Sequence, residues 1–307
     1  MNSSILTILL TSAISLIPKT GSKGKKPIRP RSPLRWVGGK YKAVLDLSEY
    51  FPPNGFKEYR EPFFGGGSVG LYIAANHENA KIIVNDLSYE LYNFWKIAQK
   101  DNERFTEILR KLLPLIEQQN KGKVIFQKAK SVLIDKAIVE ASKNNEMSAF
   151  LLAYSFFIVN RLAFSGIITA GYSGTRFTEG SIKTLEKSKK LLQNMYIRTE
   201  DYSKILNKEG EDVFIFLDPP YYDVTEKLYG VKGEFDWGEK EFRLLKRRLK
   251  RTPHKFLLTV NDHPFIRKLF TEEGFYIYDR NYTYSSSATR KKKLELIITN
   301  YKVKKKE

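Results

Sequence analysis

The chain has 307 residues, enough for one large domain with an insertion or for two domains. It contains no cysteine and three histidines, which excludes disulfides, thiolate metal sites and a cysteine nucleophile and argues against a dedicated zinc site. Its 53 lysines and arginines against 34 aspartates and glutamates give a net charge of +19, which favours a polyanionic partner, nucleic acid first and an anionic membrane as the alternative.

We expect residues 1–33 to form an N-terminal extension and basic linker outside the main fold. Residues 3–17 are apolar and β-branched, but the run is shorter than the ~20 residues that span a bilayer and no basic segment precedes it. This pattern argues against the alternative of a signal peptide. Residues 18–33 are rich in lysine, arginine, glycine and proline, as in linkers whose charge can meet phosphate. We therefore expect a cytoplasmic protein without stable membrane association.

The first candidate site is Trp36-Val37-Gly38-Gly39-Lys40. Two glycines before a lysine resemble the end of a phosphate loop, but the first glycine of that motif and the Ser or Thr after the lysine are missing. What remains is a close turn with Trp36 as an aromatic wall and Lys40 as a cation that can meet a carboxylate. The alternative is an ordinary surface turn with its lysine in water.

A strand, a glycine turn and a helix are predicted between residues 58 and 72. The glycines after Phe63 allow the backbone to approach a ligand closely and to adopt positive φ. A second strand, predicted from residue 81, ends at Asp86, about 20 residues after the glycines, where an acid usually binds ribose hydroxyls. The alternative role for Asp86 is the N-cap of a helix over residues 87–98, and the two roles are compatible.

A helical insertion is predicted between the second strand and the rest of the sheet. Apolar residues recur at helical spacing from Phe105 to Ile116 and again over residues 149–157. Asn160-Arg161 then leads into a polar loop with several glycines, which offers Thr169 and Arg176 to base edges or phosphates. The alternative is an ordinary loop that ends a helix.

The stretch from Val213 to Tyr222 carries the chemistry. Five apolar residues predict a strand buried on both faces, and Asp218-Pro219-Pro220 ends it. Ligands bind at the carboxyl ends of strands in open α/β sheets. A carboxylate and a backbone carbonyl at Asp218-Pro219 can accept both hydrogens of an amino group, and Tyr221 can stack on a flat ring. The segment therefore fits a nucleobase with an exocyclic NH2, with a plain Pro-rich turn as the alternative.

The remaining elements complete an α/β pattern. Further strands are predicted over residues 195–199, 255–260, 275–278 and 294–300. A basic amphipathic helix is predicted over 235–249, and we interpret its charges as a solvated face. Residues 223–233 form a polar loop suited to closing over a base, and the loop 282–293 carries Arg290 for a phosphate. We expect the tail from 302 to be disordered.

Six motifs, in this order along the chain, resemble those of the Dam-like, D12 class of adenine-specific DNA methyltransferases. They are Trp36–Lys40, Glu61–Gly67, Asn85-Asp86, Asn160-Arg161, Asp218–Tyr221 and Glu295–Tyr301. The similarity covers residues 34–301 and is loose between 100 and 190. It implies a Rossmann-like, S-adenosylmethionine-dependent methyltransferase sheet of the α/β class with a helical target-recognition insertion. The catalytic domain would comprise residues 34–100 and 191–307, and the recognition domain residues 101–190.

The resemblance also implies S-adenosylmethionine as cofactor, without a metal. Its contacts would be Trp36 and Lys40 near the amino-acid end, Phe63, Gly65 and Gly67 beneath the methionine, Asp86 on the ribose, Asp218 at the junction with the base, and residues 200–202 near the adenine. Asp218, Pro219 and Tyr221 would be catalytic.

Double-stranded DNA would be the substrate, contacted by Asn160, Arg161, Thr169, Arg176 and Arg290, and a cognate restriction endonuclease would be a further partner. GATC-methylating relatives carry an arginine shortly after the glycine that corresponds to Gly166, whereas this chain has Ile167-Ile168-Thr169, so GATC is not assigned as its site.

The expected reaction is transfer of a methyl group to N6 of a flipped-out adenine. The N6 lone pair is delocalised into the ring, and acceptance of both N6 hydrogens at Asp218-Pro219 would restore it. A base inside a duplex must be flipped to reach such a pocket, and stacking on Tyr221 offsets much of the unstacking energy. Methylation at carbon 5 of cytosine is excluded, because it needs a cysteine adduct. Two alternatives stay open: an N4-cytosine methyltransferase, which usually has Ser in place of Asp218, and a non-catalytic DNA-binding protein, which would lose Lys40, Asp86 or Asp218.

Overall fold

The computed structural model describes residues 26–118, 120–174, 177–223, 237–283 and 292–303. Several predicted features lie outside the described residues: the extension over 3–17, residues 18–25 of the basic linker, the loop 223–233 after its first residue, Arg176, Arg290 and the tail from 304. No helix in the described ranges is long and apolar enough to cross a bilayer.

A seven-stranded sheet forms the centre of the fold, in the order β3-β2-β1-β4-β5-β7-β6. The strands are β1 (Glu58–Glu61), β2 (Lys81–Asn85), β3 (Met195–Arg198), β4 (Val213–Leu217), β5 (Lys255–Asn261), β6 (Tyr276–Thr283) and β7 (Lys292–Thr299). The first five strands in this order are parallel, and β7 runs antiparallel to both β5 and β6. This doubly wound, Rossmann-like order confirms the predicted fold class.

Strand β4 is buried on both faces, as its continuous apolar sequence predicts. Side chains alternate across a strand, so Phe214 and Phe216 enter one core, while Val213, Ile215 and Leu217 enter the other. Asp218, the next residue, therefore leaves the sheet at its carboxyl edge rather than within either core.

Helices cover both faces of the sheet. On one face lie η1 (Lys40–Lys42), α2 (Val44–Ser48), α3 (Ser68–Asn76), α4 (Tyr89–Lys100) and α9 (Glu179–Leu192). On the other lie α10 (Tyr202–Leu206), α11 (Glu239–Arg251) and α12 (Pro264–Thr271). The helix predicted over 235–249 thus begins later and ends later than expected. Its apolar residues Phe242, Leu245 and Leu249 are buried.

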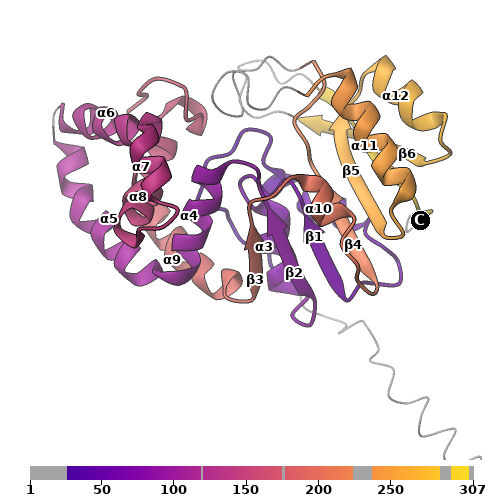
Figure 1. The fold of residues 1–307 in the computed structure, drawn as a ribbon, viewed down its shortest axis with the longest axis horizontal. Helices are drawn as coiled ribbons and strands as arrows, with labels where there is room; N and C mark the ends of the chain where they lie inside the picture. The colour runs from indigo at the N-terminus through magenta and orange to yellow at the C-terminus, as the bar shows by residue number, and fades with distance from the viewer. Residues whose placement is uncertain (1–25, 119, 175–176, 224–236, 284–291, 304–307) are drawn as a thin grey trace, which may run out of the picture.

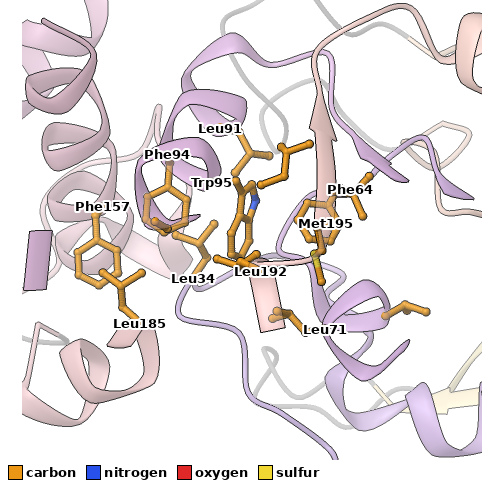
Figure 2. Packing of buried hydrophobic residues seen from close by; sticks show 14 of the residues in the cluster. Leu34, Phe64, Leu71, Leu91, Phe94, Trp95, Phe157, Leu185, Leu192 and Met195 are labelled. Carbon is orange, nitrogen blue, oxygen red and sulfur yellow. The ribbon is translucent and has the colours of Figure 1, made fainter. Parts of the chain in front are cut away.

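The predicted helical insertion lies beyond the β3 edge of the sheet (Figure 1). It contains α5 (Asn102–Glu117), α6 (Lys121–Ile134), α7 (Lys136–Ala141), α8 (Glu146–Leu162) and η2 (Phe164–Gly166). Figure 2 shows how α4 joins it to the sheet: Phe94 stacks on Phe157 of α8 with ring centroids 5.9 Å apart, and Trp95 packs toward Phe64. The insertion and the sheet share this hydrophobic core.

Candidate active site

A cavity of about 440 Å³ opens at the carboxyl ends of β1, β2 and β4. Strand β1 connects to β2 on one side and pairs with β4 on the other, so the cavity lies where the strand order reverses. The segments that line it are residues 35–40, 61–69, 85–88, 166–169, 200–202 and 218–221, together with Glu90, Phe216, Trp237 and residues of α6, α8 and α11. Four of the motifs that the sequence singled out thus meet in one place.

The loop between β1 and α3 requires glycine. Gly65 and Gly67 have φ of +49° and +73°, values that favour glycine. A Cβ on Gly65 would lie 2.7 Å from Nε1 of Trp36, and one on Gly67 would lie 2.9 Å from Cζ of Phe64. The glycines therefore let Trp36 pack directly on the loop, and the turn at residues 36–40 and the glycine loop form one wall of the cavity.

Asp86 follows β2 and faces the glycine loop. Its Oδ2 accepts a hydrogen bond from the backbone N–H of Gly65 at 2.8 Å, and its Oδ1 accepts one from the N–H of Ser88 at 3.1 Å. Burial raises the pKa of Asp86 to about 6. The N-cap of α4 is Ser88, whose Oγ accepts from the N–H of Leu91, rather than Asp86. Each oxygen of Asp86 keeps acceptor capacity for a ligand hydroxyl.

Three aromatic rings line the cavity on the side of the glycine loop. The ring centroid of Phe63 lies 5.3 Å from that of Tyr202 and 5.2 Å from that of Trp237, and the last two are 5.7 Å apart. All three residues contact the cavity. The cluster offers an apolar surface for a flat ring.

Asp218 lies at the other end of the cavity in a dense set of contacts. Nζ of Lys40 donates to both carboxylate oxygens at 2.7 Å, and Oγ1 of Thr259 donates to Oδ1 at 2.8 Å. A carboxylate offers about four lone-pair positions, so these three contacts leave one acceptor position, on Oδ2. Burial raises the pKa of Asp218, and Lys40 opposes that rise.

Lys40 is buried, with 3% of its surface exposed, so the alternative of a surface lysine in water does not hold. Its Nζ also donates to Oη of Tyr221 and to the carbonyl of Gly38, each at 3.1 Å. Burial acts to lower the pKa of Lys40, but attraction to Asp218 and its neighbours outweighs it and raises the pKa. Lys40 is therefore cationic at neutral pH.

Contacts at Tyr221 and Tyr222 hold the turn after Asp218. The hydroxyl of Tyr221 donates to Oε1 of Glu295, and Nζ of Lys40 lies 5.2 Å from the centroid of the Tyr221 ring. The side chain of Asn261 binds both backbone groups of Tyr222, at 2.9 Å each. Pro219 lies between Asp218 and these anchored tyrosines and lines the cavity. The structure thus brings Asp218, Pro219 and Tyr221 together.

Of the residues predicted to contact DNA, the structure describes Asn160, Arg161 and Thr169, and these three differ in their surroundings. Asn160 is fully buried: its side-chain amide accepts from the N–H of Arg35 at 2.9 Å and donates to the carbonyls of Arg35 at 2.8 Å and Gly166 at 2.9 Å. Asn160 therefore connects the backbone at Arg35 to that at Gly166 inside the fold and does not lie at the surface. Arg161 is half-buried, with Nη1 3.4 Å from the carbonyl of Pro33, while Thr169 is exposed at the edge of the cavity.

Several site residues escaped the sequence analysis or received no role there. They are Thr259, Arg280 and Glu295 behind Asp218, Trp237 in the aromatic cluster, and Phe164, which is 65% exposed beside Gly166. A signal existed for Glu295, because a lone acid inside the apolar run of a buried strand needs a partner. Among the residues that the structure describes, no group of three or more potential ligands could hold a metal ion.

Comparison with known proteins agrees with the order of the motifs. A family model described as D12 class N6 adenine-specific DNA methyltransferase matches residues 36–285. The type II methyltransferase M.MjaIII of Methanocaldococcus jannaschii is 26% identical over 80% of this chain and 88% of its own length. The DNA N-6-adenine-methyltransferase of Escherichia phage P1 is 26% identical over 84% of this chain and 34% of its own length. The type II methyltransferase M1.LlaDCHI of Lactococcus lactis subsp. cremoris is 23% identical over 91% of this chain and 98% of its own length.

Proposed function

Because the chain belongs to the D12 class of N6 adenine-specific DNA methyltransferases, we propose that Asp218 accepts a hydrogen of adenine N6 while the methyl group of S-adenosylmethionine is transferred to that nitrogen. The observation that carries the proposal is one continuous cavity with a glycine loop and Asp86 at one end and Asp218 with Tyr221 at the other. A cofactor and a flipped base can meet between these two ends.

The residues at the first end fit S-adenosylmethionine. The close approach of Trp36 to Gly65 leaves a smooth backbone surface, the free acceptor positions of Asp86 suit a ribose diol, and the cluster around Phe63 suits an adenine ring. The predicted contacts of Trp36, Phe63, Gly65, Gly67 and Asp86 remain our proposal. When bound, this cofactor supplies a methyl group activated by a sulfonium.

The residues at the second end can prepare N6 for attack. The free lone pair on Oδ2 of Asp218 accepts one N6 hydrogen, and the backbone carbonyl of the Asp218-Pro219 segment accepts the other. The nitrogen lone pair then withdraws from the ring and becomes available for a bond to the methyl carbon. The proton that N6 loses passes to Oδ2 of Asp218, and the cofactor would leave as a thioether. Tyr221, whose hydroxyl is turned toward Glu295, offers its ring rather than its hydroxyl to the base, and such stacking is worth ~1–3 kcal/mol.

Lys40 acts on Asp218 rather than on the base. Its ammonium opposes the rise in the pKa of Asp218 that burial causes, and it fixes the orientation of the carboxylate through two 2.7 Å contacts. The carboxylate is thereby held as an acceptor, as the reaction requires. Holding the acceptor and the amine in one geometry contributes a large part of the rate.

We assign DNA recognition to the helical insertion, residues 101–190. Helix α6 carries four lysines and no acid, and Lys130 lines the cavity while its Nζ binds the carbonyl of Thr169 at 3.0 Å. The exposed lysines of α6 can contact phosphates, and the exposed ring of Phe164 can stack on a base. For Asn160 the burial supports a positioning role instead of a DNA contact.

The comparisons and the cavity also bear on the restriction partner and on the two alternative functions. The relatives from Methanocaldococcus jannaschii and Lactococcus lactis are named type II methyltransferases, which supports a role in restriction–modification with a cognate endonuclease. The match to an adenine-specific family disfavours N4-cytosine as the acceptor. Retention of Lys40, Asp86 and Asp218 in one cavity disfavours a protein that only binds DNA.

The experiment is a methylation assay on the full chain. Purified protein is incubated with unmethylated genomic DNA and S-adenosylmethionine labelled in the methyl group, and the DNA is then digested to nucleosides. The label is expected in N6-methyladenine. Label in N4-methylcytosine would replace adenine by cytosine as the acceptor, and DNA binding without cofactor binding would favour the non-catalytic alternative.

Cofactor affinity is expected to fall at acid pH. Burial places the pKa of Asp86 at about 6, so the carboxylate is ionised above that pH and protonated below it, where it loses acceptor capacity for the ribose hydroxyls. Calorimetry should show the Kd for S-adenosylmethionine rising by up to about tenfold per pH unit below pH 6. Asp86→Asn should bind weakly at every pH, whereas Glu140→Gln, on the exposed face of α7, should follow the wild type. A Kd that stays flat through this range would contradict the role given to Asp86.

A further inference from the structure

A chain of charges continues behind Asp218, away from the cavity, and it is buried except at Asp46, whose side chain is 49% exposed. It connects three parts of the sequence: Lys40 (η1) with Asp46 (α2), the turn after β4, and Arg280 (β6) with Glu295 (β7). Neither Arg280 nor Glu295 lines the cavity, and the methyl transfer described above uses neither of them. Buried charges need a reason, because desolvation makes them costly.

Glu295 is the centre of this chain. It is 3% exposed and lies on β7, directly opposite Arg280 of β6 and Asn261 of β5. Its Oε2 accepts from Nη1 of Arg280 at 2.7 Å, and its Oε1 accepts from the hydroxyl of Tyr221. The same Oε1 lies 3.6 Å from Nζ of Lys40. One carboxylate therefore contacts two of the groups that adjoin Asp218.

Arg280 holds the carboxylate of Glu295 on the side away from the cavity. Nη1 of Arg280 binds Glu295, and Nε binds Asp46, two residues before the end of α2. Helix α2 follows directly after η1, which carries Lys40. The guanidinium thus joins the helix next to Lys40 to the strand that holds Glu295, and its rigid fork sets their separation.

Glu295 also affects how strongly the ammonium of Lys40 neutralises the charge of Asp218. The ammonium of Lys40 lies between two carboxylates, 2.7 Å from Asp218 and 3.6 Å from Glu295. Without that second charge, Lys40 would neutralise Asp218 more completely, and Asp218 would be a weaker acceptor for N6 hydrogens. Tyr221 would at the same time lose the partner that turns its hydroxyl away from the base.

We propose that Glu295, held by Arg280, is a positioning residue for methyl transfer: it orients Tyr221 through the hydroxyl and shares Lys40 with Asp218. The proposal rests on the proposed function and deepens it. Glu295 does not touch the base or the cofactor. It acts on Tyr221 through the hydroxyl and on Asp218 through the shared cation Lys40.

The test is the isosteric variant Glu295→Gln, which keeps the shape and removes the charge. We expect kcat for DNA methylation to fall about 10- to 100-fold, because small displacements of reacting groups have effects of that size. The KM for DNA and the calorimetric Kd for S-adenosylmethionine should stay within about threefold of the wild type. Glu273→Gln is the matched control: Glu273 also pairs with two cations, Lys246 and Lys250, but does not line the cavity, and its kcat should not change.

A second variant, Tyr221→Phe, retains the ring and removes only the hydroxyl that Glu295 binds. It should lower kcat, and the double variant should be no slower than Glu295→Gln alone, because both changes break the same contact. If the double variant loses the product of the two single-variant factors in kcat, Glu295 does not act through the hydroxyl of Tyr221, and that part of the proposal is overturned. If Glu295→Gln does not fold, Tyr221→Phe decides by itself: a reduced kcat supports the proposal, and an unchanged kcat overturns it.

The outcomes separate this inference from the proposed function. An active wild type with a folded Glu295→Gln variant of unchanged kcat would overturn the inference alone. A wild type that leaves every adenine unmethylated would overturn the proposed function, and the inference with it.

Discussion

Asp218→Ala is expected to lower the rate of adenine methylation by about 10²- to 10⁴-fold, the usual contribution of a positioned acid–base group. The substitution removes the acceptor position on Oδ2 of Asp218 that Lys40 and Thr259 leave free. N6 would then keep its lone pair delocalised into the ring. The measurement is the single-turnover rate of label transfer to DNA, with DNA retention measured in parallel and expected to persist.

Two further variants make this result specific. Asp218→Asn preserves the volume but presents an amide NH2 or a weaker carbonyl acceptor to the base, so it should be nearly as slow as the alanine variant. Asp262→Ala removes an acid that binds Arg267 outside the cavity and should leave the rate unchanged. Thermal unfolding checks that each variant folds. The Asp218 variants are expected to fold, because the buried Lys40 keeps Glu295 as an acidic neighbour. An Asp218→Ala enzyme that methylates at the wild-type rate would remove Asp218 from the reaction.

The second large effect is on stability. Arg60, on β1 beneath the glycine loop, is fully buried: Nε donates to Glu58 at 2.6 Å, and the guanidinium donates to the carbonyls of Ile205, Lys208 and Glu209. Arg60→Met should reduce the free energy of unfolding by about 3–5 kcal/mol, because it leaves Glu58 and the carbonyls without their buried partner. Urea titration followed by circular dichroism measures this loss.

The neighbouring ion pair supplies the matched control. Glu58 also binds Lys81 at 2.8 Å, but the side chain of Lys81 is 48% exposed. Lys81→Met should therefore change the free energy of unfolding by less than about 1 kcal/mol. Equal losses in the two variants would show that burial does not distinguish these pairs.

The arrangement around Arg60 connects stability to the site. Its carbonyl partners lie at the end of α10 and just after it, so the guanidinium ties that segment to β1. Tyr202, at the start of α10, belongs to the aromatic cluster of the cavity. Loss of Arg60 is thus expected to loosen one wall of the cofactor end even in molecules that remain folded.

Much of the fold and one half of the site could be predicted from the sequence. The apolar run of β4, the glycines after Phe63 and the acids that end two strands are local patterns, and each reflects backbone geometry that acts over a few residues. Because parallel strands end at the same edge of a sheet, those patterns also place Asp86 and Asp218 in one cavity. The order of six motifs then indicated the family, which the family model confirmed.

Tertiary structure alone decided which side chains meet at the cavity and which are buried inside the fold. The pairing of Lys40 with Asp218 joins residues 178 positions apart, and that of Tyr221 with Glu295 joins residues 74 positions apart, so no local pattern reports either. Asn160 has the residue type of a DNA contact but lies buried against Arg35. The physical reason is that periodicity and backbone freedom are local properties, whereas burial, and with it the strength of a charge contact, depends on which distant elements pack together.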